Sequence, residues 1–474
     1  MAEKDGKILV VDLDGTLLRS DMLFESFWSA FGNNWRVLFS SLPAMARGRA
    51  SLKHHLARAA LIDAAALPYD DRVLAYIERW REDGGQAVLV TGSDQKFADQ
   101  ISSHLGIFDE AHGSDGERNL TSELKAEFVV QRYGEEKFAY IGDAVADLPV
   151  WNRAAKAITV NARASLRLKA ENACAACEHL VTQVRPKVAY LKALRPHQWL
   201  KNTLVSVPML AAHQLTGNTL FSAAAAFICF SLVASGIYIF NDLVDLSADR
   251  THPHKRYRPF AAGDIPLFHG TWMGIGLLAS GVSLSALMGS TFLLLILGYL
   301  VFTISYTLHF KHHIVIDICV LAGLYAARVF AGGVATEIEL SDWLLPFSAS
   351  IFLSLAAVKR QAELVDITAR GQLSAKGRGY HAGDLPIISM VAIGAGYMSV
   401  LLMALYVSSP AVAGLYDHPE ALWGVSAVVL FWVTRLVLIA HRGSMHDDPI
   451  IFATRDNVSW VCLITILILI FYGV

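Results

Sequence analysis

The sequence is poor in cysteine and has almost no net charge. Only 5 of its 474 residues are cysteines, and Cys174 and Cys177 form the one closely spaced pair. A zinc or redox centre would need a second pair or a thioredoxin-like context, so we interpret these thiols as incidental. The formal net charge of −2 gives no reason to expect a polyelectrolyte partner such as nucleic acid.

Long apolar runs are missing before about residue 199 and frequent after it. Residues 1–7 lack the apolar core of a secretory leader, so we expect the first domain to stay in the cytoplasm. The whole chain is nevertheless 54% apolar, with a mean hydropathy of +0.41, which exceeds the usual range of soluble proteins. This contrast predicts a soluble N-terminal domain followed by an integral membrane domain.

The N-terminal domain, residues 1–161, alternates short β-like runs with helical patterns. The strand-like runs are residues 8–12, 87–91, 138–142 and, more weakly, 157–160. Strands separated by helices predict a parallel α/β sheet. Residues at about 22–75 are helical in pattern, like a small cap inserted after the first strand. Residues 162–198 are polar, alanine-rich and basic, and we expect a helical linker there.

Residues 199–474 are predicted to form an all-α membrane domain with about nine transmembrane helices. The apolar segments are roughly 200–216, 220–240, 267–287, 291–310, 314–335, 343–358, 386–408, 418–440 and 457–474. The loops on one side of these segments contain Lys and Arg, and the loops on the other side contain none. By the positive-inside rule this pattern predicts basic loops and an N-terminal domain on the cytoplasmic face of a bacterial plasma membrane.

Two aspartates follow the first predicted strand, in Val11-Asp12-Leu13-Asp14-Gly15-Thr16. An Asp at the carboxyl end of a parallel strand lies where α/β folds place their chemistry. Asp12 suits a nucleophile for phosphorus, because an aspartyl-phosphate is readily hydrolysed. Asp14 could protonate the leaving oxygen and then activate water.

Other polar residues follow the later strands. Thr91 could donate a hydrogen bond to a phosphoryl group, and Lys125 could neutralise charge in the transition state. Asp143 and Asp147, in Gly-Asp-Ala-Val-Ala-Asp, suit Mg²⁺ held together with Asp12 and a substrate phosphate.

Taken in order, these four motifs resemble those of the haloacid dehalogenase (HAD) superfamily. With its second aspartate, Asp14, the first motif resembles that of the phosphatase branch rather than that of the dehalogenases. The resemblance implies a Rossmann-like α/β fold and a Mg²⁺-dependent phosphatase, with a helical cap that shapes substrate choice.

A second acidic cluster ends a long apolar segment. Asn241, Asp242, Asp245 and Asp249 follow it, and in a helix the three aspartates share one face. Carboxylates at a membrane boundary are costly unless they bind cations or face water. Mg²⁺ that bridges them to a diphosphate leaving group is the natural use.

The next stretch is rich in cations. It reads His-Pro-His-Lys-Arg-Tyr-Arg-Pro and contains Lys255, Arg256 and Arg258. These side chains could bind phosphate oxygens, Arg as a fork and Lys as a point charge.

The acidic motif and the Arg-Pro-x-x-x-Gly that follows it resemble the first Asp-rich motif of the UbiA-type intramembrane prenyltransferases. The resemblance covers about residues 190–474 and implies a Mg²⁺–diphosphate site at Asp242, Asp245 and Asp249. The second Asp-rich motif of that superfamily is irregular here. Between Tyr306 and Arg328 there is no Asp-x-x-x-Asp.

Further details resemble one branch of this superfamily, the decaprenyl-phosphate phosphoribosyltransferases. The stretch Arg195-Pro-His-Gln-Trp-Leu-Lys201-Asn precedes the first apolar segment, and Lys359-Arg-x-Ala-Glu363 ends a later one. The branch implies phosphoribosyl diphosphate as donor and a polyprenyl phosphate as acceptor, with catalytic roles for Asp242 and Asp245. The substrate-binding residues it implies are Lys201, Asn241, Lys255, Arg256, Arg258, Lys311, Asp317 and Arg328.

These residues are compatible with three functions. The first is transfer of 5-phosphoribose to a polyprenyl phosphate, with a HAD domain that dephosphorylates the product. The second is a UbiA-type aromatic polyprenyltransferase, acting on 4-hydroxybenzoate or a quinone precursor from a polyprenyl diphosphate, with a fused phosphatase. The third is a transporter or a membrane anchor for the phosphatase. The missing Asp-x-x-x-Asp argues against the second, and the clustering of carboxylates in one loop argues against the third.

Overall fold

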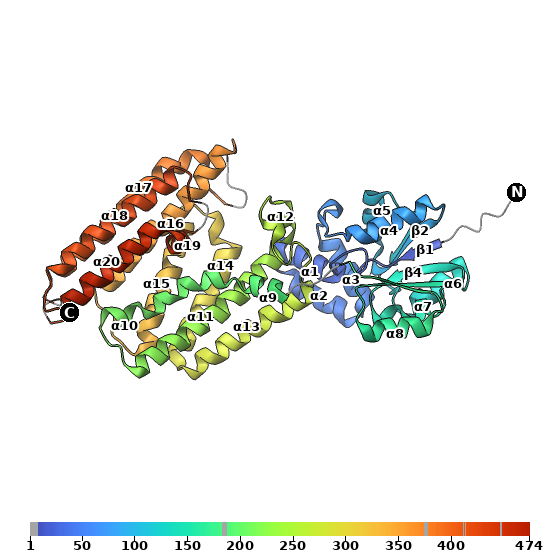
Figure 1. Cartoon of the computed structure of the whole chain (residues 1–474), viewed down its shortest axis with the longest axis horizontal. Helices are drawn as coiled ribbons and strands as arrows, with labels where there is room; N and C mark the ends of the chain where they lie inside the picture. The colour runs from blue at the N-terminus through green and yellow to red at the C-terminus, as the bar shows by residue number, and fades with distance from the viewer. Residues whose placement is uncertain (1–7, 183–186, 374–377, 411, 413, 446–447) are drawn as a thin grey trace. The chain divides into compact units, whose positions relative to one another are not determined.

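The computed structural model describes residues 8–182, 187–373, 378–410, 412, 414–445 and 448–474. Within them the chain folds as two compact units (Figure 1). The first comprises Met1–Leu194 and Tyr238–Gly274, and the second comprises Arg195–Ile237 and Ile275–Val474. The first unit therefore includes the end of one long helix, the start of the next, and the polar segment between them.

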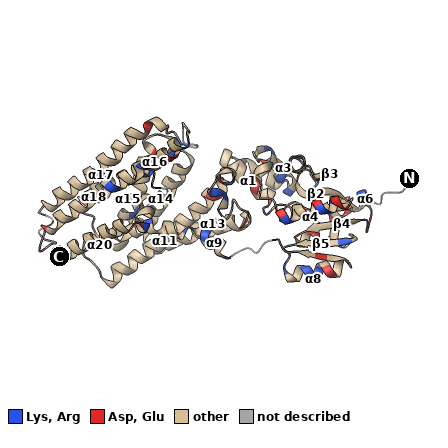
Figure 2. Cartoon of the chain, turned by 45° about the horizontal axis from the view of Figure 1, so that its top comes forward, with Lys and Arg blue, Asp and Glu red and all other residues tan. Residues whose placement is uncertain are grey.

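Charged residues are unevenly distributed along the chain. They are frequent on the helices and strands of the α/β part. The long helices α15 (Ile316–Thr336), α17 (Leu385–Val407) and α18 (Ala421–His441) are largely without them (Figure 2). Helices that are apolar on nearly all sides are typical of membrane spans.

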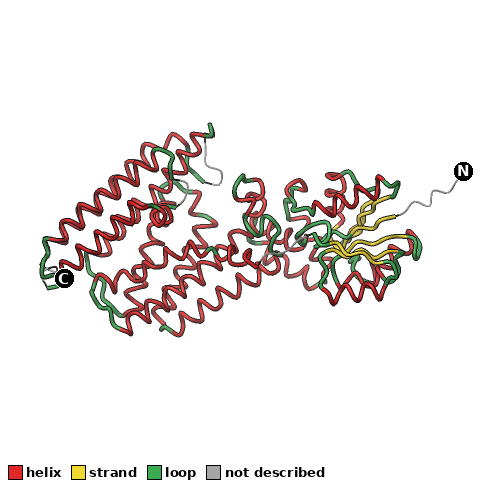
Figure 3. The backbone as a smooth tube through the Cα atoms, viewed as in Figure 1, coloured by secondary structure: helices red, strands yellow, loops and turns green. Residues whose placement is uncertain are grey.

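The α/β part is built on a six-stranded parallel sheet in the order β3-β2-β1-β4-β5-β6. Figure 3 shows its strands in yellow. Its strands are β1 Ile8–Val11, β2 Gln86–Asp94, β3 Glu110–Ser114, β4 Phe138–Gly142, β5 Lys156–Val160 and β6 Cys177–Leu180. The strand order reverses between β1 and β4, and in such sheets ligands bind outside the carboxyl ends of the strands at this point. The predicted Rossmann-like α/β fold is confirmed.

Helices cover both faces of this sheet. They are α4 Asp71–Glu82, α5 Gln95–Leu105, α6 Glu123–Tyr133, α7 Leu148–Trp151 and α8 Ala164–Ala173. Leu9 and Val11 of β1 belong to the apolar core on one face, and Val10 belongs to the core on the other. A strand buried on both faces explains why β1 reads as a continuous apolar run rather than an alternating one.

The segment between β1 and α4 is helical, as the sequence predicts for a cap. It contains α1 Met22–Asn33, α2 Val37–Ala46, α3 Arg49–Ala59 and the short η1 Ala64–Ala66. Asp21 caps α1 through its side chain, which accepts from the N–H of Leu23. An aspartate at this position satisfies a backbone donor that the helix cannot pair.

Residues 177–180, expected within a helical linker, form the edge strand β6 beside β5. The described residues around it form two separate helices, α8 and α9 (Lys187–Leu194). A run of four residues is too short to show the alternation of a strand. The pairing of β6 with β5 therefore decides its conformation.

The remaining helices form the membrane domain. They are η3 Pro196–Ser206, α10 Val207–Ala211, α11 Gly217–Val244, α13 Leu267–Leu287, α14 Ser290–Leu308, α15, α16 Leu344–Ala369, α17, α18, α19 Pro449–Arg455 and α20 Asn457–Gly473. The short α12 Leu246–Thr251 and η4 Lys255–Tyr257 lie between α11 and α13. The largest apolar core of this domain is formed mainly by α15 to α18.

The predicted count of nine spans is not confirmed. Among the described residues, 6 helices are long and apolar enough to cross a membrane, or 7 if the bent pair α19 and α20 is one span. Residues 200–216 form a 3-10 helix and the short α10 instead of one long helix. The C-terminal half of α16 carries Lys359, Arg360 and Glu363, which lower its apolar character.

Candidate active sites

Asp12 lies directly after β1, at the point where the strand order reverses. Its backbone N–H donates to the carbonyl of Ile141 in β4 at 3.0 Å, which holds the two loops together. Gly15 adopts a left-handed φ of 76°, and a Cβ there would overlap the carboxylate of Asp143. A glycine is therefore needed where these two acidic loops approach.

Lys125 comes from α6 and is buried beside Asp12. Its Nζ lies 2.7 Å from Asp12 Oδ1 and 3.7 Å from Asp147 Oδ1, and it donates to the hydroxyl of Tyr140 at 3.0 Å. A buried ammonium between two carboxylates offsets part of their negative charge. The structure thus brings the predicted cation to the predicted nucleophile.

The Asp14 carboxylate is held at both oxygens. The backbone N–H of Met22, at the start of α1, donates to Oδ1 at 2.7 Å, and the Ser93 hydroxyl donates to Oδ2 at 2.6 Å. These bonds fix its position two residues after Asp12. A fixed carboxyl group at this place suits proton transfer to and from a leaving oxygen.

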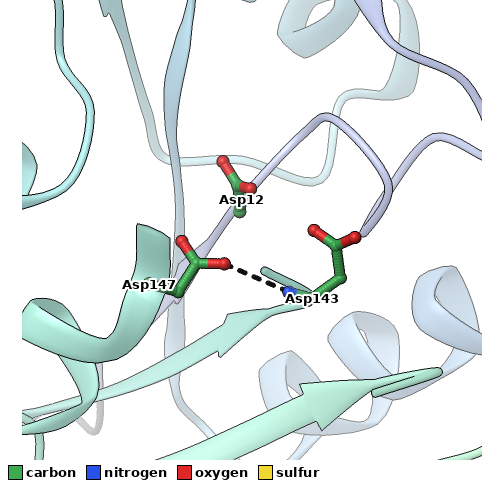
Figure 4. Close-up of side chains that lie close together, drawn as sticks. All are labelled: Asp12, Asp143 and Asp147. Atoms are coloured by element: carbon green, nitrogen blue, oxygen red, sulfur yellow. Dashed lines mark hydrogen bonds between the residues drawn. The ribbon is translucent and has the colours of Figure 1, made fainter. Parts of the chain in front are cut away.

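Asp12, Asp143 and Asp147 gather around one space (Figure 4), with one oxygen of each within 4.8 Å of the others. Asp147 Oδ2 accepts from the backbone N–H of Asp143 at 3.2 Å, and its Oδ1 accepts from Tyr140 at 2.6 Å. Three converging carboxylates form the oxygen-only donor set that Mg²⁺ prefers. The residues present therefore fit the magnesium ion that the HAD motifs imply.

Burial changes the acidity of this cluster. It raises the pKa of Asp12 to about 7, although the charge of Lys125 opposes the rise. It also raises the pKa of Asp14 to about 6 and that of Asp143 well above its usual range. Crowded buried carboxylates favour protons or a metal, and a bound cation would keep them ionised.

Ser93 and Lys53, which no sequence motif singled out, lie beside Thr91. Thr91 is buried in β2, and its Oγ1 accepts from the N–H of Ser93 at 3.0 Å. Lys53 reaches in from α3 of the cap, and its Nζ donates to the carbonyl of Gly92 at 2.5 Å. Burial lowers the pKa of Lys53, while the nearby Asp14 raises it. A lone lysine in a basic cap carried no sequence signal of its own.

The second acidic site lies at the end of α11. Asp242 and Asp249 are both buried, and Arg258 bridges them, at 3.0 Å from Asp242 Oδ1 and 2.6 Å from Asp249 Oδ2. The helix is interrupted at Asp245, whose N–H still donates to the carbonyl of Asn241. Among the described residues only the HAD site brings three carboxylates within metal-binding distance. Of the three aspartates predicted to share one face, Asp242 and Asp249 are joined by the guanidinium of Arg258.

Arg250 follows Asp249 in α12 and pairs with the HAD cap. Its two terminal nitrogens lie 3.0 and 2.6 Å from the Glu25 oxygens, and Glu25 also accepts from Ser20 at 2.5 Å. Both charged groups are buried. A bidentate pair of this kind is strong and directional, so it fixes α12 against α1 within the first unit.

The helical unit contains a separate buried charge cluster. Lys201 Nζ lies 2.8 Å and Lys359 Nζ 3.2 Å from Asp448 Oδ2, and the Tyr325 hydroxyl donates to the same carboxylate at 2.9 Å. Asp448 is a residue that the sequence reading missed. Its signal was the Asp-Pro step that starts α19, which reads as a plain helix cap.

Arg328 and Asp317 are both buried in α15, in different surroundings. Arg328 donates to Asn202 Oδ1 at 2.9 Å and to the Tyr299 hydroxyl at 2.7 Å. Asp317 lies 2.6 Å from Arg360 and 3.2 Å from Arg378. Its charge is matched by two guanidinium groups, which suits a positioning role better than phosphate binding.

The other predicted phosphate-binding residues are more open. Lys255 and Arg256 are exposed in η4, and Arg256 donates to the Tyr257 hydroxyl at 2.6 Å. Lys311 lies in η5 (Phe310–His312), between α14 and α15, and is half-buried. Loop cations with mobile ends can close on a ligand that arrives from solution.

The fold and these acidic sites define a membrane enzyme with a separate α/β hydrolase domain. The chain matches the haloacid dehalogenase-like hydrolase family over residues 9–151 and the UbiA prenyltransferase family over residues 202–454. It belongs to the UbiA prenyltransferase family and carries a HAD domain fused before the membrane domain. It is therefore an integral membrane protein that joins a transferase to a hydrolase.

Three relatives are similar to this chain over different shares of its length. "Uncharacterized protein y4nM" of Sinorhizobium fredii is 36% identical over 455 residues, which are 95% of this chain and 88% of that protein. "Nodulation protein NoeC" of Azorhizobium caulinodans is 36% identical over 59% of this chain and 91% of its own length. "Decaprenyl-phosphate phosphoribosyltransferase" of Mycobacterium tuberculosis is 39% identical over 40% of this chain, and the match spans 64% of that protein.

Proposed function

We propose that the membrane domain transfers 5-phosphoribose from phosphoribosyl diphosphate to a polyprenyl phosphate, and that the HAD domain then removes the 5-phosphate. The observation that carries the first step is the 39% identity to a decaprenyl-phosphate phosphoribosyltransferase. The motifs around Lys201 and Lys255–Arg258 support it independently. The second step is supported by the HAD site, which gathers all the groups that phosphate hydrolysis needs.

In the transfer, the bond from ribose C1 to the diphosphate oxygen breaks and a bond from C1 to an acceptor phosphate oxygen forms. Positive charge develops on the ribose, and the diphosphate leaves with the bonding electrons. Asp242, Asp245 and Asp249 would hold Mg²⁺, which would neutralise the leaving diphosphate. Arg258 bridges two of these carboxylates, so it would exchange them for phosphate oxygens when Mg²⁺ and the diphosphate bind.

In the hydrolysis, Asp12 attacks the phosphorus of the ribose 5-phosphate. Asp14 gives its proton to the departing ribose oxygen, then takes a proton from the water that cleaves the aspartyl-phosphate. Lys125 stays beside Asp12 and balances charge on the phosphoryl group. Asp12, Asp143 and Asp147 would hold Mg²⁺, which lowers the repulsion between the carboxylates and the phosphate.

The proposed arrangement places the HAD domain (residues 1–161) and the basic loops on the cytoplasmic side, where phosphoribosyl diphosphate is available. The transferase would occupy residues 199–474. A product that keeps its lipid tail stays in the membrane beside the tethered phosphatase, so its effective concentration is high.

A radiolabel transfer assay tests both steps. Membranes with the protein receive polyprenyl phosphate, Mg²⁺ and phosphoribosyl diphosphate labelled in the ribose, with wild type, Asp12→Asn and Asp242→Asn run in parallel. We expect label in the lipid fraction for the first two, with the 5-phosphate kept only in Asp12→Asn, and none for Asp242→Asn. No lipid label from folded wild type would refute the transfer and direct the search to aromatic acceptors. Equal phosphate content in the first two would detach the phosphatase from this reaction.

A further inference from the structure

The outer face of cap helix α2 is apolar where a soluble domain would be polar. Trp35, Leu38, Phe39, Leu42 and Met45 are 52%, 48%, 60%, 60% and 65% exposed. Their spacing of three and four residues places them on one side of the helix. The opposite side points inward. These five residues form an apolar stripe, and exposing such a contiguous apolar patch to water is unfavourable.

The stripe differs from other exposed apolar residues of the α/β part. Other elements of this part expose one or two such residues each, as is usual on a protein surface: Leu61, Leu124, Val145, Leu168, Val181, and Val188 with Leu191 of α9. In the described α/β part, only α2 and the turn before it present five such residues on one face. The feature therefore calls for an apolar neighbour.

The charge around the stripe indicates what that neighbour is. Residues 26–62 contain no Asp or Glu and 5 basic residues: Arg36, Arg47, Arg49, Lys53 and Arg58. The exposed Arg36, Arg47 and Arg49 flank the two ends of α2. An apolar helix face flanked by arginines and by a tryptophan matches the surface of an anionic bilayer. A protein partner would instead be expected to meet a stripe bordered by both signs of charge.

We propose that α2 inserts its apolar face into the headgroup region of an anionic membrane. The chain is itself an integral membrane protein, so a bilayer is always within reach of its HAD domain. The inference deepens the proposed function, on which it rests for the substrate alone: a phosphatase whose cap is seated in lipid is built for a lipid-linked phosphate.

The cap connects this surface to the HAD site. Ser40 of α2 lies 3.1 Å from His55 Nε2 of α3, and Lys53 of α3 donates to Gly92, next to Thr91. Seating α2 in lipid would therefore hold α3 and Lys53 over the catalytic carboxylates.

Depth-dependent quenching tests the insertion itself. Cys177 and Cys319 are replaced by Ser, since the other three cysteines are buried, and Leu42→Cys or Leu168→Cys is labelled with an environment-sensitive fluorophore. The two leucines are matched controls, because each is 60% exposed. The protein is reconstituted in nanodiscs of phosphatidylglycerol and phosphatidylcholine, with and without brominated acyl chains.

We expect bromine to quench the probe at position 42 and to leave the probe at position 168 unchanged. Equal quenching at both positions, or none at either, would overturn the proposal. A probe at position 42 that is shielded from water but not quenched would show that protein covers the stripe, and would also overturn it. None of these results depends on the phosphatase substrate.

A second arm measures the consequence for catalysis. The double variant Phe39→Ser, Leu42→Ser should keep wild-type hydrolysis of soluble p-nitrophenyl phosphate. Its KM for a phosphorylated polyprenyl lipid in the same nanodiscs should rise about 10-fold or more, because two large apolar side chains are lost from the lipid contact. Leu168→Ser should change neither activity. An unchanged KM for the lipid in the double variant would refute a role of the stripe in substrate access. If the wild-type protein did not hydrolyse p-nitrophenyl phosphate, the proposed phosphatase would be refuted instead.

Discussion

At the scale of single residues, the HAD site contains four carboxylates and the buried ammonium group of Lys125, which offsets part of their charge. Asp12, Asp143 and Asp147 converge on one space, Asp14 lies two residues after Asp12, and the Lys125 ammonium donates to Asp12, the proposed nucleophile. The sequence predicted each of these residues because ordered motifs carry them. It could not predict Ser93 or Lys53, since their positions depend on how β2 and the cap fold back over Asp14.

Lys125→Met should remove phosphatase activity without unfolding the chain. The methionine fills a similar volume, but Asp12 and Asp147 lose their shared cation, so the phosphoryl group meets uncompensated charge. We expect kcat for p-nitrophenyl phosphate to fall about 10²- to 10³-fold, with lipid labelling by the transferase unchanged. Lys169→Met, on the exposed side of α8, is the control. Retention of more than a tenth of wild-type kcat would contradict this role for Lys125.

At the scale of elements, predictions succeeded where a pattern is long or repeated. The runs at 8–12, 87–91, 138–142 and 157–160 match β1, β2, β4 and β5, because buried parallel strands need continuous apolar residues. The edge strands β3 and β6 were missed because runs of five and four edge residues carry little pattern. Asp448 was missed because its partners, Lys201 and Lys359, are far away in sequence and meet it only through tertiary packing.

The contact between α1 and α12 predicts a strong energetic coupling. Glu25→Gln or Arg250→Met alone leaves a buried charge without its partner, and should destabilise the first unit by about 3–5 kcal/mol. The double variant should be more stable than the sum of the two losses, which a double-mutant cycle of thermal unfolding would measure.

The control for this cycle is the pair of Glu123 and Arg153, 3.1 Å apart, in which Glu123 is exposed. Glu123→Gln should cost less than about 1 kcal/mol, because solvent screens a surface pair. Glu25→Gln should also lower transferase activity, since α12 carries Asp249. Additive losses in the cycle would show that the two buried charges act independently.

The buried cluster of the helical unit joins elements from its beginning, middle and end. Asp448→Asn should leave the buried Lys201 and the half-buried Lys359 without their shared carboxylate, and should destabilise this unit by about 3 kcal/mol. We expect earlier loss of the monomer peak when the detergent-solubilised protein is heated before size-exclusion chromatography. Asp342→Asn, in an exposed loop, serves as the control, and equal melting of the two variants would refute a structural role for the cluster.

At the scale of the whole molecule, the reason for joining two enzymes in one chain can be tested through the intermediate. If a phosphorylated lipid made at Asp242 is hydrolysed by the same chain, wild type in vesicles should release almost none of it. Asp12→Asn and Asp242→Asn variants reconstituted together must pass the lipid by diffusion in the membrane. We expect this pair to accumulate phosphorylated lipid about 10-fold above wild type at early times, because the effective concentration of a tethered site is lost.

The same two variants in separate vesicles give the limiting case. A polyprenyl lipid does not leave its bilayer on the time scale of the assay, so the label should keep its 5-phosphate throughout. Early time courses that coincide for wild type and the co-reconstituted pair would mean that lateral diffusion alone supplies the phosphatase. The fusion would then serve to keep the two enzymes in one membrane in equal amounts, and not to pass the intermediate within one chain.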